Sequence, residues 1–182
     1  MRIITGKARG ANLYTLAGNT TRPTSDRVKE AVFSMLQFEI EGRSVLDLFG
    51  GSGQLALEAL SRGARDAVIA DSERAAVEII KKNAEKTKLS ADCTIMLSDW
   101  KETLRRSSGK KFDIVFLDPP YSSGLIPEVL KSLYQHLKPT SIVVCESDQD
   151  ISDRIDCRYE IKKTVKYGVA HVMLLNIKAT EE

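Results

Sequence analysis

The chain has few residues of the kinds that build metal sites and disulfides: three cysteines and two histidines in 182 residues. The cysteines are odd in number and scattered, with no metal-ligand spacing, so we expect structural thiols, no disulfide and no metal. Long apolar runs are also missing, and none approaches the length needed to cross a bilayer. The first ten residues carry charges where a secretory signal would be apolar. We therefore expect a cytoplasmic protein with no membrane partner.

The composition is that of an ordinary globular protein, with 42% apolar and 29% charged residues. The length fits one domain that can bury a full core. We expect a single domain over residues 1–182, in which a basic N-terminal extension (1–40) precedes the cofactor-binding and catalytic core (41–182).

Positive charge is concentrated at the N-terminus. Residues 1–30 contain six basic and two acidic side chains, so their charge is +4, and the rest of the chain must be −2 because the total is +2. Such a segment is either a solvated arm or a surface that contacts nucleic-acid phosphates, and charge alone does not decide between them. On a helix, Arg27 and Lys29 would not share a face, so at least one of them can be solvated. The candidates for phosphate contact are Arg2, Lys7, Arg9, Arg22 and Arg27.

From residue 44 onward, apolar strands alternate with amphipathic helices. This alternation predicts an α/β fold: a mostly parallel seven-stranded sheet with helices on both faces, preceded by a small N-terminal hairpin and helix. The expected strands are 45–48, 67–70, 93–97, 112–117 and 141–145, with a terminal hairpin of 159–166 and 169–177. The expected helices are 25–38, one around Leu55 to Leu60 that stops at Gly63, 73–88 and 125–137, and the first hairpin pairs 3–5 with 12–15.

Acidic residues fall at or just after the ends of five successive strands. Ligands of parallel sheets bind beyond the carboxyl ends of the strands, so these acids are expected to converge along one rim. Taken alone, Asp99 or Glu146 is more simply a turn former or a helix cap. The five acids are Asp47, Asp71, Asp99, Asp118 and Glu146.

The turn Phe49-Gly50-Gly51-Ser52-Gly53 connects the first core strand to a helix. Its glycines and Asp71, about twenty residues on, fit a dinucleotide fingerprint, so this motif alone does not separate a nicotinamide cofactor from S-adenosylmethionine. Asp47 favours S-adenosylmethionine, because a carboxylate there would repel a pyrophosphate and attract the ammonium of a methionine moiety. In that interpretation Asp71 binds the ribose, and Asp99 and Trp100 lie at the adenine. The candidate cofactor-binding residues are Asp47, Phe49, Gly50, Gly51, Gly53, Asp71, Ser72, Asp99 and Trp100.

Residues 112–121 form an apolar strand that ends in Asp118, Pro119, Pro120 and Tyr121. Two consecutive prolines lack backbone donors and fix two φ angles, so the strand stops and Asp118 is held rigidly at its carboxyl end. The carboxylate and the Pro119 carbonyl can accept hydrogen bonds from an exocyclic amine, and Tyr121 can stack on the ring. These four residues are the candidate catalytic residues of a methyltransferase that acts on a nucleobase amine.

Beyond these motifs, the chain resembles the small ribosomal RNA methyltransferases that modify the exocyclic N2 of a guanine in 16S RNA. The resemblance covers essentially the whole chain, and the Arg22-Pro23-Thr24 segment and residues 58–64 are the parts most particular to the family. Departures are Gly50 for alanine, Gln54-Leu55-Ala56 for Ala-Leu-Gly, and Asp71 for glutamate, which shortens the ribose-binding arm by one methylene. The segments that carry the resemblance are 1–10, 22–33, 45–53 with 57–64, 112–121, and the Lys166-Tyr167-Gly168 turn.

The resemblance implies a Rossmann-like class I methyltransferase that uses S-adenosylmethionine and acts on 16S rRNA or a partly assembled 30S particle. Two other functions remain open. A DNA or RNA adenine-N6 methyltransferase would use the same acid-Pro-Pro-Tyr chemistry, although a chain of this length leaves no room for a separate sequence-reading domain. A nicotinamide-dependent oxidoreductase would use the glycine turn but leaves residues 118–121 unexplained.

Overall fold

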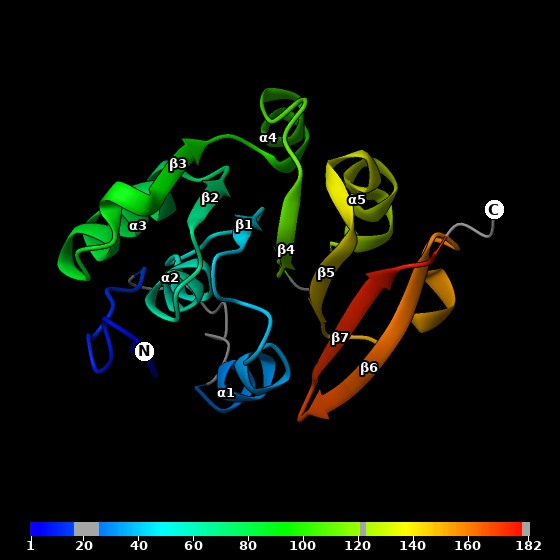
Figure 1. Ribbon diagram of the computed structural model, residues 1–182, viewed down its shortest axis with the longest axis horizontal. Helices are drawn as coiled ribbons and strands as arrows, with labels where there is room; N and C mark the ends of the chain where they lie inside the picture. The colour runs from blue at the N-terminus through cyan, green and yellow to red at the C-terminus, as the bar shows by residue number, and fades with distance from the viewer. Residues whose placement is uncertain (17–25, 121–122, 180–182) are drawn as a thin grey trace.

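The computed structural model describes residues 1–16, 26–120 and 123–179, which fold into one seven-stranded sheet covered by helices (Figure 1). The strand order is β3-β2-β1-β4-β5-β7-β6. Strands β1 to β5 pair in parallel, whereas β7 runs antiparallel to both β5 and β6. The strands are β1 (Ser44–Asp47), β2 (Asp66–Asp71), β3 (Cys93–Leu97), β4 (Phe112–Leu117), β5 (Leu137–Ser147), β6 (Tyr159–Tyr167) and β7 (Ala170–Ile177).

Helices cover both faces of the sheet, as the sequence pattern predicts. Successive strand residues point to opposite faces, so Val45 and Phe116 join one core while Leu46 and Val115 join the other. Helices α1 (Asp26–Met35), α2 (Gln54–Ser61) and α3 (Arg74–Lys86) pack on the first core. Helices α4 (Trp100–Arg106) and α5 (Ile126–Leu133) pack on the second. Because β4 is buried on both sides, its residues are apolar apart from Asp113.

The N-terminal hairpin is present in minimal form, but it pairs residues 1–3 with 10–13 where 3–5 with 12–15 were expected. Arg2 and Asn12 form an isolated antiparallel bridge, and the segment docks on α2, where the amide of Lys7 donates to the carbonyl of Ser61 at 2.8 Å. A Cβ on Gly6 would lie 1.8 Å from that carbonyl oxygen, and Gly6 has a φ of 86°. Only glycine fits at this close contact with α2 and at this positive φ. The charge pattern of the segment does not indicate this requirement.

Glu58 of α2 holds this N-terminal segment in place. Its carboxylate accepts the amides of Ile4 at 2.7 Å and Thr5 at 3.0 Å, and it pairs with Arg62 at 2.8 Å. The Nζ atom of Lys29 lies 3.6 Å from the carboxylate and also donates to the carbonyl of Arg2. Both the Lys29 and the Glu58 side chains are fully buried. Lys29 is therefore a structural residue and not a solvated or RNA-contacting one.

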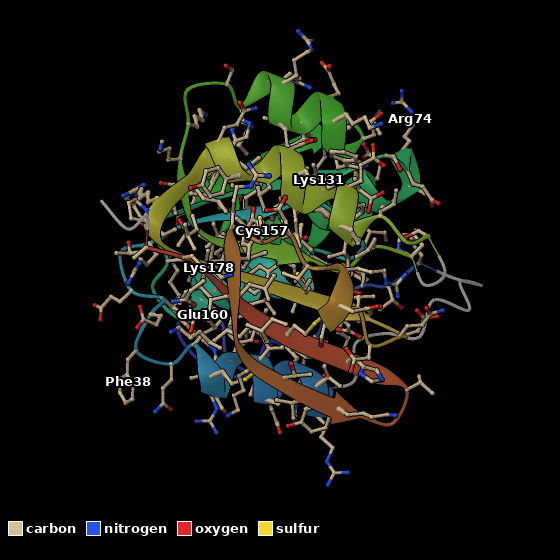
Figure 2. The ribbon with its side chains drawn as sticks, turned by 90° about the vertical axis from the view of Figure 1, so that its right-hand side faces the viewer. Phe38, Arg74, Lys131, Cys157, Glu160 and Lys178 are labelled. Atoms are coloured by element: carbon tan, nitrogen blue, oxygen red, sulfur yellow. The ribbon has the colours of Figure 1, made fainter. Side chains whose placement is uncertain are left out.

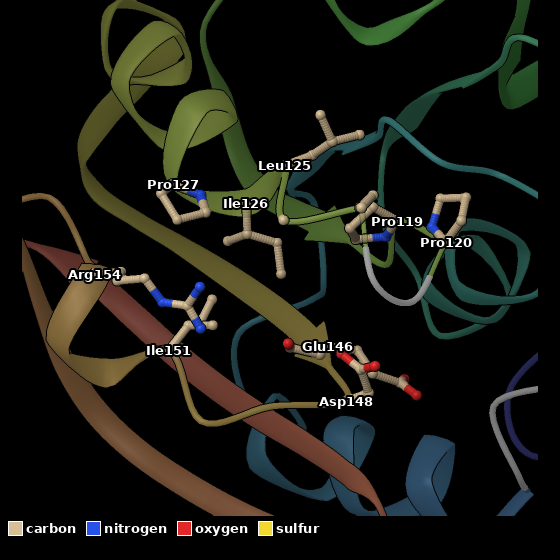
Figure 3. Close-up of a pocket in the computed structure, with 12 residues that line it drawn as sticks. Pro119, Pro120, Leu125, Ile126, Pro127, Glu146, Asp148, Ile151 and Arg154 are labelled. Atoms are coloured by element: carbon tan, nitrogen blue, oxygen red, sulfur yellow. The ribbon is translucent and has the colours of Figure 1, made fainter.

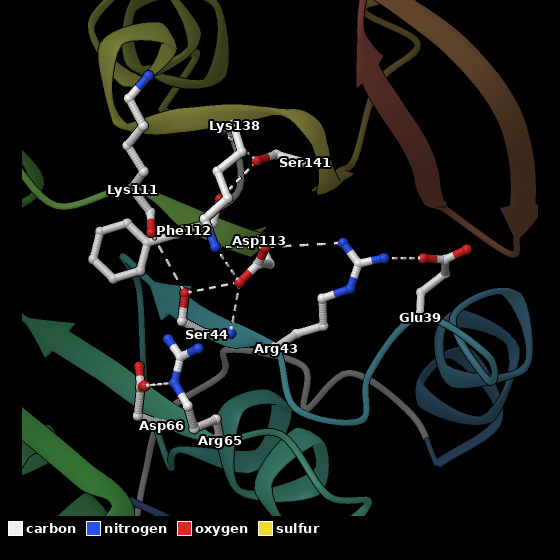
Figure 4. A network of polar contacts seen from close by, with 10 residues as sticks. All are labelled: Glu39, Arg43, Ser44, Arg65, Asp66, Lys111, Phe112, Asp113, Lys138 and Ser141. Carbon is white, nitrogen blue, oxygen red and sulfur yellow. Dashed lines mark hydrogen bonds and ion pairs between the residues drawn. The ribbon is translucent and has the colours of Figure 1, made fainter.

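A polar network joins β1 and β4 at the amino edge of the sheet, opposite the rim where ligands bind (Figure 4). Asp113 accepts the Ser44 amide at 3.0 Å and pairs with Lys138 at 2.8 Å. Burial by itself would raise the pKa of Asp113, but the hydrogen bonds from Lys138 and Ser44 outweigh it and lower that pKa. These bonds fix the register of the two strands that carry Asp47 and Asp118 at their other ends.

Several element boundaries differ from the sequence prediction. Helix α4 was not predicted, because its seven residues include Lys, Arg and Glu and show too short an apolar pattern. Strand β5 begins at Leu137, four residues before the predicted start, since Leu137 pairs with Phe112 of β4. Helix α1 ends at Met35, and the side chain of Phe38 beyond it is 90% exposed at the surface (Figure 2).

Within the described ranges, no helix combines the length and the apolar character that crossing a membrane requires. Cys93, Cys145 and Cys157 are free thiols. The same ranges contain no group of three or more His, Cys, Asp or Glu side chains arranged to hold a metal ion.

Candidate active site

A cavity of about 560 Å³ opens at the carboxyl ends of the parallel strands. It lies where the strand order reverses, between β1 and β4, because α2 follows β1 onto one face and α5 follows β4 onto the other. This volume is typical of small-molecule sites. Eleven predicted site residues line it: Asp47, Phe49, Gly50, Gly51, Asp71, Ser72, Asp99, Trp100, Asp118, Pro119 and Pro120.

Asp47 is a buried acid of the cavity with a strongly shifted pKa. It is 1% exposed, and its carboxylate accepts hydrogen bonds from the amides of Phe49 and Ala56. Burial, with a smaller contribution from the charge of Asp71, raises the pKa of Asp47 to about 7. No lysine or arginine of the described residues pairs with it. A buried carboxylate without a cation is costly, and a cationic group of a ligand would relieve that cost.

The amides of the glycine turn are largely used within the protein. The Gly50 amide donates to the Ala70 carbonyl at 2.8 Å, and the Gly51 amide donates to the Asp71 carboxylate at 2.9 Å. Amides bonded in this way cannot cradle a pyrophosphate. Gly53 caps α2 with a φ of 79° and does not line the cavity.

The close approach of β2 and α3 to the glycine turn explains Gly50, the position where the family resemblance expects alanine. A Cβ on Gly50 would lie 2.7 Å from the Ile69 side chain and 2.9 Å from that of Ile80. These distances are too short for an alanine in this packing. The departure from the family pattern therefore has a steric cause.

Asp71 is the last residue of β2 and Asp99 lies just after β3, and each keeps part of its capacity to accept hydrogen bonds. Asp71 accepts one amide on each oxygen, from Gly51 and from Glu73, both at 2.9 Å. Asp99 caps α4 by accepting the Glu102 amide at 2.8 Å on Oδ1. A carboxylate has about four acceptor positions, so both can still bind ligand hydroxyls or amines. Trp100, 7% exposed, supplies an apolar wall.

Asp118, Pro119 and Pro120 form the opposite wall, directly after β4. Tyr121 lies outside the described residues. The two prolines and Leu125 also border a second recess of about 30 Å³, which Figure 3 shows between Glu146 with Asp148 on one side and Ile151 with Arg154 on the other. A recess of this volume holds a water molecule and not a base. Glu146 therefore lies at the rim as predicted, but behind the proline wall.

Sequence reasoning missed a wall of the cavity that comes from the N-terminal segment. Met1, Thr15 and Leu16 line it, although they precede the core by many residues. Asn83 of α3, fully buried, holds this wall: its Oδ1 accepts the Tyr14 amide at 2.7 Å, and its Nδ2 donates to the carbonyls of Tyr14 at 3.0 Å and Ser52 at 2.8 Å. The sequence held one signal of this wall, because Asn83 is a polar residue on the inward face of a predicted amphipathic helix. Gln54, Leu55, Glu73, Ala76 and Leu125 were also missed.

The basic candidates are on the surface but are not gathered into the cavity. Arg2, Arg9 and Arg27 are exposed, and Lys7 is exposed while it pairs with Asp92 at 3.1 Å. Arg22 lies outside the described residues. None of the four described candidates lines the cavity, so a role in RNA binding stays a prediction.

Known proteins are similar in sequence to most of this chain. The family described as Conserved hypothetical protein 95 matches residues 1–176. "Ribosomal RNA small subunit methyltransferase D" of Escherichia coli (strain K12) is 35% identical over 81% of this chain and 75% of its own length. The protein of the same name from Haemophilus influenzae is 34% identical, over 82% and 80%.

A solved structure agrees with this assignment. That of a hypothetical protein from Thermus thermophilus superposes with a TM-score of 0.81 at 25% identity and covers 97% of this chain and 99% of its own. The antiparallel β7 inserted before β6 distinguishes the sheet from the all-parallel dinucleotide-binding order. The fold is that of a Rossmann-like class I methyltransferase, and the chain belongs to the Conserved hypothetical protein 95 family, together with the small-subunit ribosomal RNA methyltransferases D.

Proposed function

We propose that this protein methylates the exocyclic N2 amine of a guanine in 16S ribosomal RNA and uses S-adenosylmethionine as the methyl donor. One observation carries the proposal: a single cavity is lined on the β1 side by the buried Asp47 and on the β4 side by Asp118, Pro119 and Pro120. The first wall suits a cationic cofactor, and the second suits an amine-bearing ring.

The residues of the cavity fit S-adenosylmethionine better than a nicotinamide dinucleotide. Asp47 is buried and lacks a cation, which favours an ammonium group, and the bonded amides of Gly50 and Gly51 disfavour a pyrophosphate. Asp71 would hold the ribose hydroxyls, and Asp99 with Trp100 would hold the adenine. When bound, this cofactor supplies an electrophilic methyl group on a sulfonium.

Asp118 and Pro119 prepare the amine for reaction. The nitrogen of a guanine amine is a poor nucleophile because its lone pair is delocalised into the ring. The Asp118 carboxylate and the Pro119 carbonyl accept its two hydrogens and rotate the amine, so that the lone pair points toward the cofactor side of the cavity. The amine proton then leaves to Asp118 or to water. Tyr121 would stack on the base after the base has left its helix.

The choice of 16S rRNA as substrate is supported by the relatives named above, which act on small-subunit ribosomal RNA according to their names. The excess of positive charge in residues 1–30 agrees with an RNA partner. Adenine N6 is the alternative target, because the same acceptors would serve either exocyclic amine.

Methyl transfer from labelled cofactor distinguishes these targets. The substrates are 30S particles that lack the modification, protein-free 16S rRNA and naked DNA, and the product nucleoside is identified by mass spectrometry. We expect N2-methylguanosine from one of the two RNA substrates. N6-methyladenosine, or a product only on DNA, would contradict the proposal.

Variants of Asp118 test the role assigned to the acid. Asp118→Ala removes the acceptor and is expected to lower the rate of transfer by about 10²- to 10³-fold, the usual cost of losing one oriented hydrogen-bonding group at a reacting centre. Asp118→Asn keeps one acceptor oxygen and is expected to retain more activity. Cofactor affinity is the control, and it should be unchanged in both. An undiminished rate in Asp118→Ala would refute the role.

A further inference from the structure

Tyr14 presents an exposed aromatic ring beside the cavity. The residue is 50% exposed, and it directly precedes Thr15 and Leu16, which line the cavity. Exposure alternates along this segment: Asn12 and Tyr14 are exposed, whereas Leu13 between them is buried. The ring therefore lies on the outer face of the N-terminal hairpin, next to the wall that this hairpin contributes to the site.

The backbone of Tyr14 is fixed although its ring is exposed. Asn83 of α3 accepts the Tyr14 amide at 2.7 Å and donates to the Tyr14 carbonyl at 3.0 Å. A tyrosine on a fixed backbone has only two χ angles left to order, so its ring can contact a partner at a low cost in conformational entropy. Tyr14 is thus preorganised for a contact on this face.

Two lysines of α3 accompany the ring. The Nζ atom of Lys86 lies 4.3 Å from the ring centroid of Tyr14. Lys82 is exposed one helical turn earlier, on the same face of α3 as Lys86. Neither ammonium belongs to a salt bridge among the described residues, whereas the neighbouring Lys81 is paired with Glu78 at 3.0 Å. The charges of Lys82 and Lys86 are therefore available to an anionic partner.

An exposed ring beside cations without acidic partners is typical of a surface that binds single-stranded RNA. The ring can stack on any base, because every base has a π face, and the ammonium groups can contact phosphates on either side of it. The excess of positive charge in residues 1–30 favours a polyanion over a protein surface of mixed charge. Arg2 is also exposed, across the hairpin from Asn12, and adds to this charge.

We propose that Tyr14 stacks on an unpaired base of the substrate RNA while Lys82 and Lys86 contact the adjoining phosphates. The inference rests on the proposed function, since it takes RNA to be the substrate, and it extends the RNA-binding surface from the N-terminal segment to α3. The stacked base is not the base that is methylated, because Tyr14 does not line the cavity that holds Asp118.

Filter binding to protein-free 16S rRNA and to 30S particles that lack the modification tests the contact without turnover. Tyr14→Ala removes the ring but keeps the backbone hydrogen bonds to Asn83. It should weaken RNA binding at least about fivefold, which is the lower end of the usual loss for one stacked base. Tyr14→Phe keeps the ring and should bind within about twofold of the wild type.

The salt dependence of binding separates the ring from the lysines. Loss of a stacked base leaves the number of phosphate contacts unchanged, so Tyr14→Ala should keep the wild-type slope of log K against log salt. Lys82→Ala combined with Lys86→Ala should make the slope less steep by about 1.4, from roughly 0.7 per phosphate contact on single strands. A wild-type slope in this double variant would overturn the phosphate contacts.

Phe38→Ala is the matched control, since Phe38 is an exposed ring that does not line the cavity. It should leave RNA binding unchanged, and no variant of this series should alter the affinity for S-adenosylhomocysteine. A parallel loss of that affinity in Tyr14→Ala would overturn the inference, because it would indicate a general defect of the wall.

Three results with RNA would also overturn the stacking contact. The first is wild-type affinity in Tyr14→Ala, and the second is an equal loss in Tyr14→Ala and Tyr14→Phe. The third is a loss confined to 30S particles, which would indicate that the ring contacts a ribosomal protein. If the wild-type protein bound neither RNA probe, the substrate assigned in the proposed function would itself be wrong, and this inference with it.

Discussion

Asp47 is the last residue of β1, and Asp118 directly follows β4, the adjacent parallel strand. The two residues line opposite walls of one cavity. In the register of β1 and β4, Asp47 lies beside Phe116, and Asp118 comes two residues later. The helices that follow these strands leave to opposite faces of the sheet. That divergence opens the crevice, so the topology places a cofactor acid and a catalytic acid at the same reversal of strand order.

Asp47→Asn is expected to stabilise the ligand-free protein at alkaline pH and to weaken cofactor binding. Burial raises the pKa of Asp47 to about 7, so between its ordinary pKa and pH 7 the folded protein holds a proton that the unfolded chain releases. Stability contributed by this group therefore falls as pH rises through that window. At pH 8 the variant should gain on the order of 5 °C in Tm over the wild type. At pH 4 the two should melt alike.

Asp113→Asn provides a control of opposite sign. The pKa of Asp113 is lowered, so its contribution to stability is present above the ordinary aspartate pKa and is lost as pH falls. This variant should melt below the wild type at pH 7 and approach it in acid. A pH profile of Asp47→Asn parallel to that of the wild type would contradict the assignment to Asp47.

Glu58→Ala is expected to reduce the free energy of unfolding by about 3–5 kcal/mol, because it leaves Lys29 as an uncompensated buried charge. It also removes the acceptor of the Ile4 and Thr5 amides, so the N-terminal segment should become sensitive to proteolysis. Urea unfolding measures the first effect and limited proteolysis the second. Lys81→Ala, which breaks an exposed pair with Glu78, is the control and should change stability by less than about 1 kcal/mol.

Asn83→Ala is expected to weaken binding of S-adenosylhomocysteine about fivefold or more. It removes the two hydrogen bonds that tie Tyr14, next to Thr15 and Leu16 of the wall, to α3, and the third that ties α3 to Ser52 of the glycine turn. Thr87→Val is the matched control. It removes a buried hydroxyl that donates to the Asn83 carbonyl on the same helix, but it touches neither the wall nor the cavity. If both variants lost affinity in proportion to their loss of Tm, Asn83 would have no specific role in the wall.

Neutralising Arg2, Lys7 and Arg9 together is expected to reduce the salt dependence of RNA binding. Each phosphate contact on single-stranded RNA contributes roughly 0.7 to the steepness of log K against log salt. If all three residues contact phosphates, the slope of the variant should therefore be less steep by about 2. Affinity for the methyl donor should not change, because these residues do not line the cavity. Fluorescence anisotropy across a salt series gives the slope.

The control for this series neutralises three exposed lysines near the amino edge of the sheet, Lys110, Lys111 and Lys178. Their loss should leave the slope unchanged. Equal slopes for the wild type and the N-terminal triple variant would show that the basic segment is solvated.

Much of the catalytic half of the site could be read from local sequence. The apolar run 112–117 predicted β4 to the residue, and the two prolines required that it stop at Asp118. The acids after β1 and β2 were found because parallel strands end at one rim. Helix α4 was missed because so short and polar a helix depends on its cap and on the packing of Trp100 and Leu104. A helix cap was nevertheless one of the two interpretations of Asp99.

Other features depended on contacts between segments far apart in the chain. In the sequence, nothing distinguishes Lys29 from the other basic residues of the N-terminal segment. In the structure it lies against Glu58, 29 positions away, and both side chains are fully buried. Nothing in the glycine turn indicated that Ala70 and Asp71 would take its amides. Nothing in the sequence indicated that the Oε1 atom of Gln54 would lack a hydrogen-bond partner, because this depends on the residues that pack around it.

The sequence by itself determined the order of strands and helices, the end of β4 and the positions of the acids, because periodicity and proline sterics act between neighbouring residues. Only the tertiary structure decided which of those acids is buried without a cation, which amides are already bonded, and that Met1, Thr15 and Leu16 close the cavity. Desolvation and hydrogen-bond pairing arise when distant segments pack together, so no local pattern encodes them.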